Sequence, residues 1–524
     1  MKRTDMTGQL ESESRNWDIC IIGGGASGLG TALDAASRGY RTLLMEQFDF
    51  AKATSSRSTK LVHGGVRYLQ QGNIRLVLEA LRERGLLKNN APHLVKNQSF
   101  IVPNYKWWEG PYYGFGLKVY DWMSGRLGLG PSQMLSREEV LKMAPTLDPE
   151  GLRGGVLYHD GQFDDSRLAI NLAQTAVDQG AVLMNYCKVT GMIKEGGRIF
   201  GVEATDLMNS RQYSIRSRAV INATGIFTDS LLRMDDPEAE PMISPSQGVH
   251  IVLDKEFLPG DMAIMVPHTD DGRVLFAVPW HNKIIIGTTD TPMEEKNGYS
   301  LAEPVALEEE IDFILHQIGK YLSKIPDRND IKSVFAGLRP LVKNNSRKTA
   351  ELARDHVVSI SDSGLITIAG GKWTTYRHMA EDVIDTAMQW AGLEEKASIT
   401  AGLKIHGARN TEDYSAELYY YGTDEPFVRS IAAEKIELKE KIHPALPYLK
   451  AEVIWAVREE MCMNVEDFLA RRSRALFLDA KAAMEAAPEV ARLMAGEKGE
   501  NKEWIEKQIK SFNKLAVNYL PKEK

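Results

Sequence analysis

The stretch DICIIGGGASGLGTALDAASRGYRTLLMEQ, residues 18–47, decides the fold. It begins with an apolar run at 18–22, passes through closely spaced glycines and continues into a segment of small residues at 26–38. A second apolar run follows at 42–46. Runs of this length and order predict a strand, a glycine turn, a helix and a second strand. Together they form one βαβ unit of about 30 residues.

The glycines of this turn, Gly23, Gly25 and Gly28, form the pattern GxGxxG. The pattern alone is common, so the flanking strand and helix and the acidic Glu46 give it weight. Glycines let a pyrophosphate approach the backbone, where the helix N-terminus presents unpaired N–H groups. Glu46 can accept hydrogen bonds from a ribose 2′-hydroxyl but would repel a 2′-phosphate, which favours FAD or NAD over NADP. A purely structural glycine turn is the alternative.

Two distant segments are predicted to complete the same sheet. VINATG (220–225) and TIAGGKWTTYRHMAE (367–381) each begin as an apolar strand and reach a glycine. One N-terminal βαβ unit whose other strands come from far along the chain is typical of flavoproteins. In the second segment, hydroxyl residues and a helix follow the glycines, and a helix N-terminus can stabilise negative charge on a reduced flavin ring. FAD is therefore favoured over NAD.

Composition excludes several classes of protein. With 524 residues, 43% of them hydrophobic and 26% charged, the chain has the composition of a globular protein of two or three domains. A net charge of −7 argues against a nucleic-acid binder. Three separated cysteines, Cys20, Cys187 and Cys462, suit a reducing compartment and exclude a cysteine-based zinc site. We find no signal peptide and no apolar run of about 18 residues, so we expect a cytoplasmic protein.

The order of segments predicts an α/β protein with three parts. These are a Rossmann-like FAD-binding domain, a β-rich substrate domain and a C-terminal helical domain. The FAD-binding domain is expected at 17–103, 151–235 and 355–393, with an aromatic-rich insertion or lid at 104–150, the substrate domain at 236–354 and the helical accessory domain at 394–524. The polar residues 1–16 are expected to be mobile.

Five segments carry a resemblance to a known family. They are IGGGASGLGTALDAASRG (22–39), ATSSRSTKLVHGGVRYL (53–69), AGLRPL (336–341), GGKWTTYRHMA (370–380) and EVIWAVREEMCMNVEDFLARRSR (452–474). Together they resemble the FAD-dependent glycerol-3-phosphate dehydrogenases of the aerobic, quinone-linked type, from about residue 17 to 480. Leu29 departs from the small residue usual at its position. The resemblance implies a role in glycerol metabolism: oxidation of sn-glycerol 3-phosphate to dihydroxyacetone phosphate, with a hydride passing from C2 to FAD N5.

The segment 53–69 is expected to follow the cofactor from its phosphates to its ring. Its serines can donate to phosphate oxygens, Lys60 can offset their charge, and Gly64 and Gly65 permit close approach of the backbone to the flavin. The resemblance puts His63 at the flavin. A solvated polar loop is the alternative. The predicted cofactor-binding residues are Gly23, Gly25, Ala26, Ser27, Gly28, Glu46, Thr54, Ser55, Ser56, Ser58, Lys60, Leu61, His63, Gly64, Gly65, Thr224, Gly225, Gly371, Lys372, Thr374 and Thr375.

A doubly charged phosphate substrate needs cations. The predicted substrate-binding residues are Arg67, Tyr68, Arg339, Arg354 and Lys372. Each arginine alone would be read as a surface charge, and only the set indicates a site. One charge-assisted hydrogen bond contributes on the order of 1.5–3 kcal/mol, so three such residues account for micromolar-scale affinity. Thr289 and Asp290 are further candidates for contact with the pocket or the flavin.

The predicted catalytic residues are His63, His250 and Arg339. A base must take the proton of the C2 hydroxyl, and a histidine suits that task. His63 is the first choice and His250 the second, while Arg339 can stabilise the developing carbonyl oxygen. The histidines lack the spacing of metal ligands, so we expect no metal.

The electron acceptor stays open between a quinone and oxygen. Family members pass electrons to a quinone at the membrane surface, and related oxidases use oxygen. Residues 105–122 hold eight aromatic side chains and are the candidate for contact with lipid or quinone, with a packed lid as the alternative. The apolar face of 503–520 can pack in a core, which is the commoner reason for such a face, or touch the inner face of the cytoplasmic membrane. A homodimer is also left open. Rival functions are an FAD amino- or hydroxy-acid oxidoreductase and a non-catalytic flavoprotein module.

Overall fold

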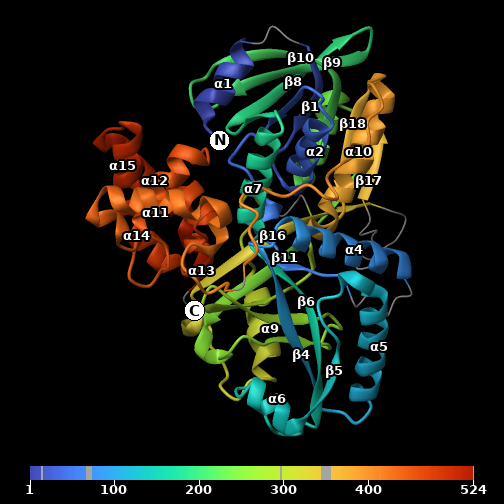
Figure 1. Cartoon of the computed structure of the whole chain (residues 1–524), viewed down its shortest axis with the longest axis vertical. Helices are drawn as coiled ribbons and strands as arrows, with labels where there is room; N and C mark the ends of the chain where they lie inside the picture. The colour runs from blue at the N-terminus through green and yellow to red at the C-terminus, as the bar shows by residue number, and fades with distance from the viewer. Residues whose placement is uncertain (13–15, 66–72, 295–297, 344–355, 412, 523–524) are drawn as a thin grey trace.

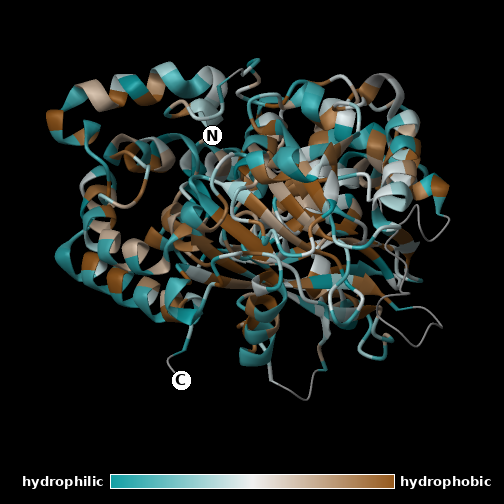
Figure 2. Ribbon diagram, turned by 90° about the horizontal axis from the view of Figure 1, so that it is seen from below, coloured by the Kyte–Doolittle hydropathy of each residue, from teal (hydrophilic) through white to brown (hydrophobic). Residues whose placement is uncertain are grey.

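Two mixed β-sheets and a lobe of helices make up the described part of the chain (Figure 1). The computed structural model describes residues 1–12, 16–65, 73–294, 298–343, 356–411 and 413–522. Hydrophobic residues concentrate on the central strands, while many of the surrounding helices carry hydrophilic residues (Figure 2). The predicted fold class is confirmed. The domain boundaries given above stay a prediction.

The first sheet is built around the predicted βαβ unit. Five of its strands run parallel, in the order β18-β10-β1-β2-β7. The distant strands β10 and β18 therefore lie beside β1, as the sequence predicted. The strands of this sheet are β1 (Trp17–Ile22), β2 (Thr42–Met45), β7 (Val182–Met184), β8 (Cys187–Glu195), β9 (Arg198–Asp206), β10 (Gln212–Asn222), β17 (His356–Ile360) and β18 (Leu365–Gly370).

Helices cover the first sheet. α2 (Ala26–Ser37) packs between α7 (Asp165–Asp178) and α10 (Tyr376–Ala391), while α8 (Thr228–Asp235) follows β10. The aliphatic side chain of Leu29, the departure from the family pattern, is completely buried in this core. The parallel strands thus point their C-terminal ends at the loops that precede α2 and α10, which is where ligands bind in open α/β sheets.

The second sheet has ten strands and carries the predicted residues His250 and Arg339. Its path is β15-β11-β14-β13-β12-β4-β6-β3, with β16 paired to β11 and β5 paired to β6. The strands are β3 (Leu61–Val62), β4 (Val95–Asn104), β5 (Gln133–Ser136), β6 (Gly154–Phe163), β11 (Ile243–Asp254), β12 (Ala263–Val266), β13 (Leu275–Trp280), β14 (Lys283–Gly287), β15 (Thr291–Pro292) and β16 (Ser333–Val342). Its helices are α4 (Ile74–Asn90), α5 (Glu109–Ser124), α6 (Arg137–Met143) and α9 (Glu308–Gly319).

The helices after residue 411 form the lobe on the left of Figure 1. They are α11 (Glu425–Glu434), α12 (Lys450–Glu459), α13 (Ala475–Leu478), α14 (Ala480–Lys498) and α15 (Lys502–Ala516). Phe512 of α15 is buried, and Trp504, Ile505, Ile509 and Leu515 pack against the core of the lobe. The core-packing alternative for the apolar face of 503–520 is therefore confirmed. Among the described residues, no helix combines the length and apolarity needed to cross a bilayer.

Arginines of the lobe reach the loop that follows β2. Arg472 donates to both carboxylate oxygens of Asp49, at 2.6 and 2.9 Å, and all these atoms are buried. Arg474 donates to the main-chain oxygen of Ser56 at 2.6 Å and to Ser166 Oγ at 2.7 Å. The lobe therefore supports the predicted cofactor loop from behind.

The expectation of a mobile N-terminus is wrong for residues 3–12. They form α1 (Arg3–Ser12), which lies against β7. Met6 and Leu10 are buried, and Arg3 forms a 2.7 Å ion pair with Asp206. Two apolar side chains four positions apart share one helix face, which suffices to dock an otherwise polar segment.

Candidate functional site

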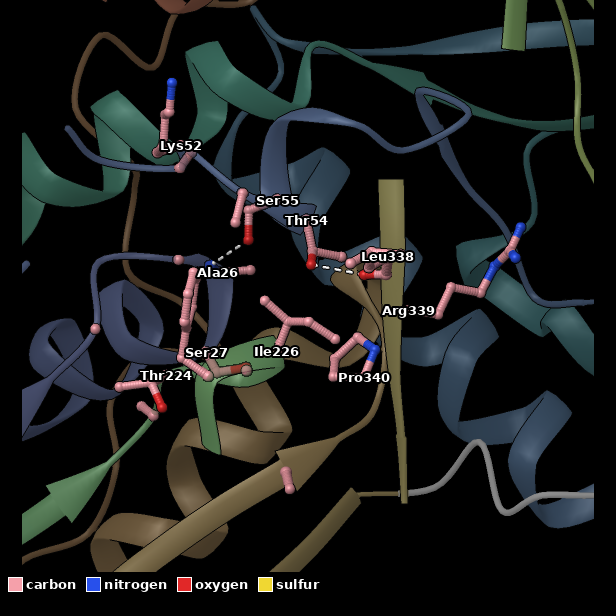
Figure 3. A pocket seen from close by; sticks show the side chains of 18 of the residues that line it. Ala26, Ser27, Lys52, Thr54, Ser55, Thr224, Ile226, Leu338, Arg339 and Pro340 are labelled. Atoms are coloured by element: carbon pink, nitrogen blue, oxygen red, sulfur yellow. Dashed lines mark hydrogen bonds between the residues drawn. The ribbon is translucent and has the colours of Figure 1, made fainter. Parts of the chain in front are cut away.

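One cavity of about 670 Å³ contains most of the predicted site residues in its wall. Figure 3 shows part of that wall, with the β1–α2 turn, the loop after β2 and the end of β16 facing one another. The wall brings together segments from the first 63 residues, from the loop after β10, from β11, and from β16 to α10. The predicted residues that line it are Gly23, Gly25, Ala26, Ser27, Glu46, Thr54, Ser55, Ser58, Leu61, His63, Thr224, Gly225, His250, Arg339, Gly371, Lys372 and Thr374.

Several other predicted residues do not form the wall. Gly28, Ser56, Lys60, Gly64, Gly65 and Thr375 are absent from the cavity lining. Arg67, Tyr68 and Arg354 lie outside the described residues. Among the described residues, some of the predicted ones therefore line the cavity, and the others lie behind its wall.

The glycine turn fits a pyrophosphate. Gly23 has φ +110°, and a Cβ there would lie 2.6 Å from the main-chain oxygen of Ala223. A Cβ on Gly28 would lie 1.8 Å from the main-chain oxygen of Gly23, so Gly28 allows α2 to pack against β1. Ser55 Oγ accepts a 2.9 Å hydrogen bond from Ala26 N and so joins the second predicted motif to this turn. Backbone N–H groups and the helix dipole then face the cavity, as an anionic phosphate requires.

Glu46 lies in the wall at the end of β2, where a ribose is expected. Its carboxylate accepts hydrogen bonds from Gly24 N at 2.6 Å and Phe48 N at 2.8 Å. Burial raises the pKa of Glu46 to about 7, although these two N–H groups act in the opposite direction. The carboxylate of Glu46 thus lies in the cavity wall at the end of β2, and its contact with a ribose stays a prediction.

Lys60 does not face the phosphates as expected. Its ammonium is completely buried and donates to Asp165 Oδ2 at 2.6 Å and to the main-chain oxygen of Ser56 at 2.7 Å. The rings of Trp280 and Phe335 lie 5.6 and 5.2 Å from it. Burial lowers the pKa of Lys60 to about 7 despite the carboxylate of Asp165. Lys60 therefore fixes the fold of the cofactor loop. Asp165 was missed because it begins an ordinary amphipathic helix.

The flavin end of the cavity joins the two motifs that the sequence placed at the ring. His63 N donates to Thr374 Oγ1 at 3.3 Å. Gly64 N donates to Tyr120 OH at 2.8 Å, which ties the aromatic helix α5 to the same loop. Gly371 has φ +75°, and a Cβ there would lie 2.3 Å from Met379 Sδ. Gly371 therefore brings the backbone into the cavity wall, as a flat ring system requires, whereas Gly64 lies outside the lining.

His250 and Arg339 project from neighbouring strands β11 and β16. His250 Nε2 lies 2.9 Å from Thr59 Oγ1, and its ring stacks on Phe335 with centroids 4.8 Å apart. Burial, reinforced by the charges of Lys60 and Arg339, holds the pKa of His250 well below its usual value. His250 is therefore neutral at physiological pH.

Arg339 is held by a segment that is not itself in the wall. Its Nη2 donates to Thr288 Oγ1 and to the main-chain oxygen of Thr289, both at 3.0 Å, and Nη1 donates to Asp290 Oδ1 at 3.2 Å. In Figure 3 the side chain of Arg339 points to the opposite side of β16 from Leu338 and Pro340. Thr289 and Asp290 were expected at the pocket or flavin, but in the described residues they lie behind Arg339 instead of in the wall.

Comparisons with known proteins agree with this architecture. A sequence profile described as "FAD dependent oxidoreductase" matches residues 18–377. A second profile, the C-terminal domain of alpha-glycerophosphate oxidase, matches residues 366–505. The fold and the cavity thus define an FAD-dependent oxidoreductase, and FAD is its cofactor.

Similar chains narrow the class further. The mitochondrial glycerol-3-phosphate dehydrogenase of Mus musculus is 40% identical over 96% of this chain and 73% of its own length. That of Homo sapiens is 41% identical over 92% of this chain and 70% of its own length. A glycerol-3-phosphate dehydrogenase from Bacillus halodurans, solved in complex with FAD, has a TM-score of 0.80 at 30% identity and covers 99% of this chain and 98% of its own. The chain belongs to the FAD-dependent glycerol-3-phosphate dehydrogenase family.

Proposed function

We propose that this protein oxidises sn-glycerol 3-phosphate at C2 and releases dihydroxyacetone phosphate. The observation that carries the proposal is that one cavity combines the dinucleotide turn with Arg339, Lys372 and two histidines. The names of the relatives support the same substrate. When bound, FAD supplies the two-electron acceptor that such an oxidation needs.

The cations of the wall favour a phosphorylated substrate. Arg339 and Lys372 bring two positive charges to one cavity. Arg67, Tyr68 and Arg354 complete the proposed substrate set from outside the described residues. An amino or hydroxy acid carries one carboxylate and needs fewer cations, so the basic set speaks against that rival. A glycine turn and a Glu46 that line the same cavity speak against a non-catalytic module.

His63 remains the proposed base for the C2 hydroxyl proton. His250 is neutral, but burial and two neighbouring cations oppose its protonation, so it is a poor proton acceptor. Its imidazole, held by Thr59, is better suited to orient the substrate through a hydrogen bond. His63 is half-buried and lines the same cavity. Arg339 is proposed to bind the phosphate or the oxygen on C2, where its charge offsets negative charge.

An anaerobic titration tests the proposal. Purified yellow protein is mixed with sn-glycerol 3-phosphate, and flavin absorbance near 450 nm is followed. We expect bleaching by this substrate and none by glycerol, amino acids or 2-hydroxy acids at the same concentration. Bleaching by an amino or hydroxy acid alone would establish the rival enzyme, and a colourless protein would establish the binding module.

A quinone at a membrane surface is the proposed acceptor. Helix α5 presents Trp108, Tyr112, Phe115 and Trp122 along one outer face, where Phe115 is 74% and Trp122 84% exposed. Its other face is packed, with Tyr113 OH 2.7 Å from His268 Nε2 and Tyr120 buried. Exposed Trp and Tyr beside Lys118 suit the headgroup region of a bilayer. Peripheral attachment to the inner face of the cytoplasmic membrane follows from this proposal.

Oxygen is the competing acceptor. The reduced protein, prepared with substrate under argon, is mixed with either aerated buffer or a soluble quinone, and the return of flavin absorbance is timed. We expect the quinone to reoxidise the flavin at least about tenfold faster than oxygen at equal concentration. Faster return with oxygen would make the protein a glycerol-3-phosphate oxidase.

A further inference from the structure

Two glycines make room for the two polar side chains at the substrate end of the cavity. A Cβ on Gly248 would lie 2.4 Å from Arg339 Nη2. A Cβ on Gly287 would lie 2.3 Å from His250 Cδ2. Both side chains therefore occupy volume that any other residue at these positions would fill. Gly287 also begins the segment 287–290, which we call the strap.

The strap binds the guanidinium of Arg339 through three hydrogen bonds. Thr288, Thr289 and Asp290 each contribute one oxygen to Arg339, at 3.0, 3.0 and 3.2 Å. Ser246, the partner of Arg339 in the β11–β16 register, donates its hydroxyl to the same Asp290 Oδ1. A carboxylate with this geometry forms a charge-assisted hydrogen bond, stronger and more directional than a neutral one.

The strap is itself anchored to α9. Glu310 is buried and accepts hydrogen bonds from Thr289 Oγ1 at 2.7 Å and Thr291 Oγ1 at 2.6 Å. Its other oxygen accepts from Gln247 Nε2 at 2.7 Å, while Val249 N donates to Thr289 Oγ1 at 3.0 Å. These bonds join the strap to β11 and to a helix outside the cavity, so the strap cannot move independently of the second sheet.

We propose that Asp290 is a positioning residue for Arg339, which it holds in the orientation that meets the substrate. This inference rests on the proposed function. An unrestrained arginine loses side-chain rotamer entropy when a ligand immobilises it, and a side chain already fixed by the protein avoids much of that loss. Asp290 is absent from the cavity lining, so its proposed effect on the substrate passes through Arg339.

The test is a double-mutant cycle with Asp290→Asn and Arg339→Ala in the full-length holoprotein. Active-site concentration is taken from flavin absorbance, and kcat and KM for sn-glycerol 3-phosphate are measured for all four proteins. We expect Asp290→Asn alone to lower kcat/KM at least about tenfold, through the same parameter that Arg339→Ala changes, with full flavin content. In the Arg339→Ala background, we expect Asp290→Asn to change kcat/KM less than twofold, because its target is gone.

Two further variants, a control and a replacement, complete the test. Asp312→Asn is the matched control. Asp312 forms a 2.6 Å ion pair with Arg328, and neither residue lines the cavity, so this variant should leave kcat and KM unchanged. If Asp290→Asn loses flavin, Ser246→Ala replaces it, because it removes only the hydroxyl that supports Asp290, and a loss of about threefold is expected. Equal costs of Asp290→Asn with and without Arg339 would overturn the inference, as would a loss smaller than twofold in both Asp290→Asn and Ser246→Ala.

Wild-type protein separates this inference from the proposed function. If sn-glycerol 3-phosphate fails to bleach the wild-type flavin, the proposed function has failed. If the wild-type flavin bleaches and the cycle shows no coupling, only the role of Asp290 has failed.

Discussion

The indole nitrogen of Trp373 donates a 2.8 Å hydrogen bond to the main-chain oxygen of Ser55, across 318 positions of sequence. The two residues belong to the two motifs that the sequence assigned to the flavin. Ser55 in turn accepts from Ala26 N in the glycine turn. Two hydrogen bonds thereby join three segments that are remote in the chain. They tie the glycine turn, where the phosphates are expected, to the segment at Trp373, where the flavin ring is expected.

Loss of Arg339 should impair turnover and leave flavin in place. Arg339→Ala removes a charge-assisted hydrogen bond of about 1.5–3 kcal/mol, which corresponds to a roughly tenfold to hundredfold fall in kcat/KM. Arg339→Lys should restore little, because an ammonium cannot reproduce the planar fork that meets Thr288 and Asp290. Steady-state kinetics with a soluble quinone measures both, and Arg328→Ala, at a partly buried ion pair outside the cavity wall, serves as control. Unchanged kinetics would remove Arg339 from the site.

Substitution of His63 should slow the chemical step more than substitution of His250. General-base catalysis contributes about 10²–10⁴-fold, so His63→Gln should reduce the anaerobic rate of flavin bleaching at least about a hundredfold. His250→Gln should raise KM more than it lowers the bleaching rate. The reverse ranking would make His250 the base.

Gly23→Ala should abolish flavin binding. The new methyl group would lie 2.6 Å from the main-chain oxygen of Ala223, and φ +110° is strained for any residue with a Cβ. We expect a colourless protein with a lowered melting temperature, measured by absorbance near 450 nm and calorimetry. Gly116→Ala, a helical glycine with open space around its Cβ position, is the matched control and should remain yellow. A yellow Gly23→Ala protein would contradict the proposed path of the pyrophosphate.

The outer face of α5 should govern attachment to lipid. Phe115→Ser with Trp122→Ser should reduce co-sedimentation with anionic vesicles at least about fivefold, because buried apolar area and interfacial aromatics drive such binding. Anaerobic bleaching by substrate should stay unchanged, since neither side chain lines the cavity. Phe427→Ser on the helical lobe, 61% exposed, is the control. Equal vesicle binding of all three proteins would refute the membrane contact.

Stability should fall as pH rises from about 6.5 to 9 through His406. Burial alone lowers the pKa of this imidazole, but hydrogen bonds to Asp178 (2.7 Å) and Asp424 (2.9 Å) outweigh it and raise the pKa to about 9. A raised pKa stabilises the folded protein fully below about 6.5 and no longer above about 9. His406→Gln should flatten this part of the melting-temperature profile and cost on the order of 2 kcal/mol at pH 6. A parallel profile in the variant would contradict the assignment.

Most of the residues predicted for the cofactor line one cavity, because each element there has a local signature. A glycine turn between strand and helix fixes its own geometry, and Glu46 follows at the end of the next strand. Lys60 shows where this reasoning fails, since its side chain turns away from the phosphates to a carboxylate more than 100 positions later. Long-range pairing of this kind has no local pattern.

The support of Arg339 was similarly hidden. Thr289 and Asp290 were expected to contact the pocket or the flavin, but their oxygens accept hydrogen bonds from Arg339 on β16. Only the antiparallel register of β11 with β16, which brings Ser246 opposite Arg339, makes that relation visible. The mobile N-terminus was mispredicted because two apolar residues carry little weight in a polar segment until a partner surface is known.

Arg472 and Arg474 of the helical lobe bind Asp49 and Ser56 in the loop after β2, so the lobe supports the predicted cofactor loop. A chain shortened to the first 393 residues would expose apolar surface and strip a buried carboxylate of its counter-charge, a change that costs several kcal/mol. The dinucleotide loop would lose its backing at the same moment. Release of flavin and melting of the lobe should therefore occur together on heating, as one cooperative event.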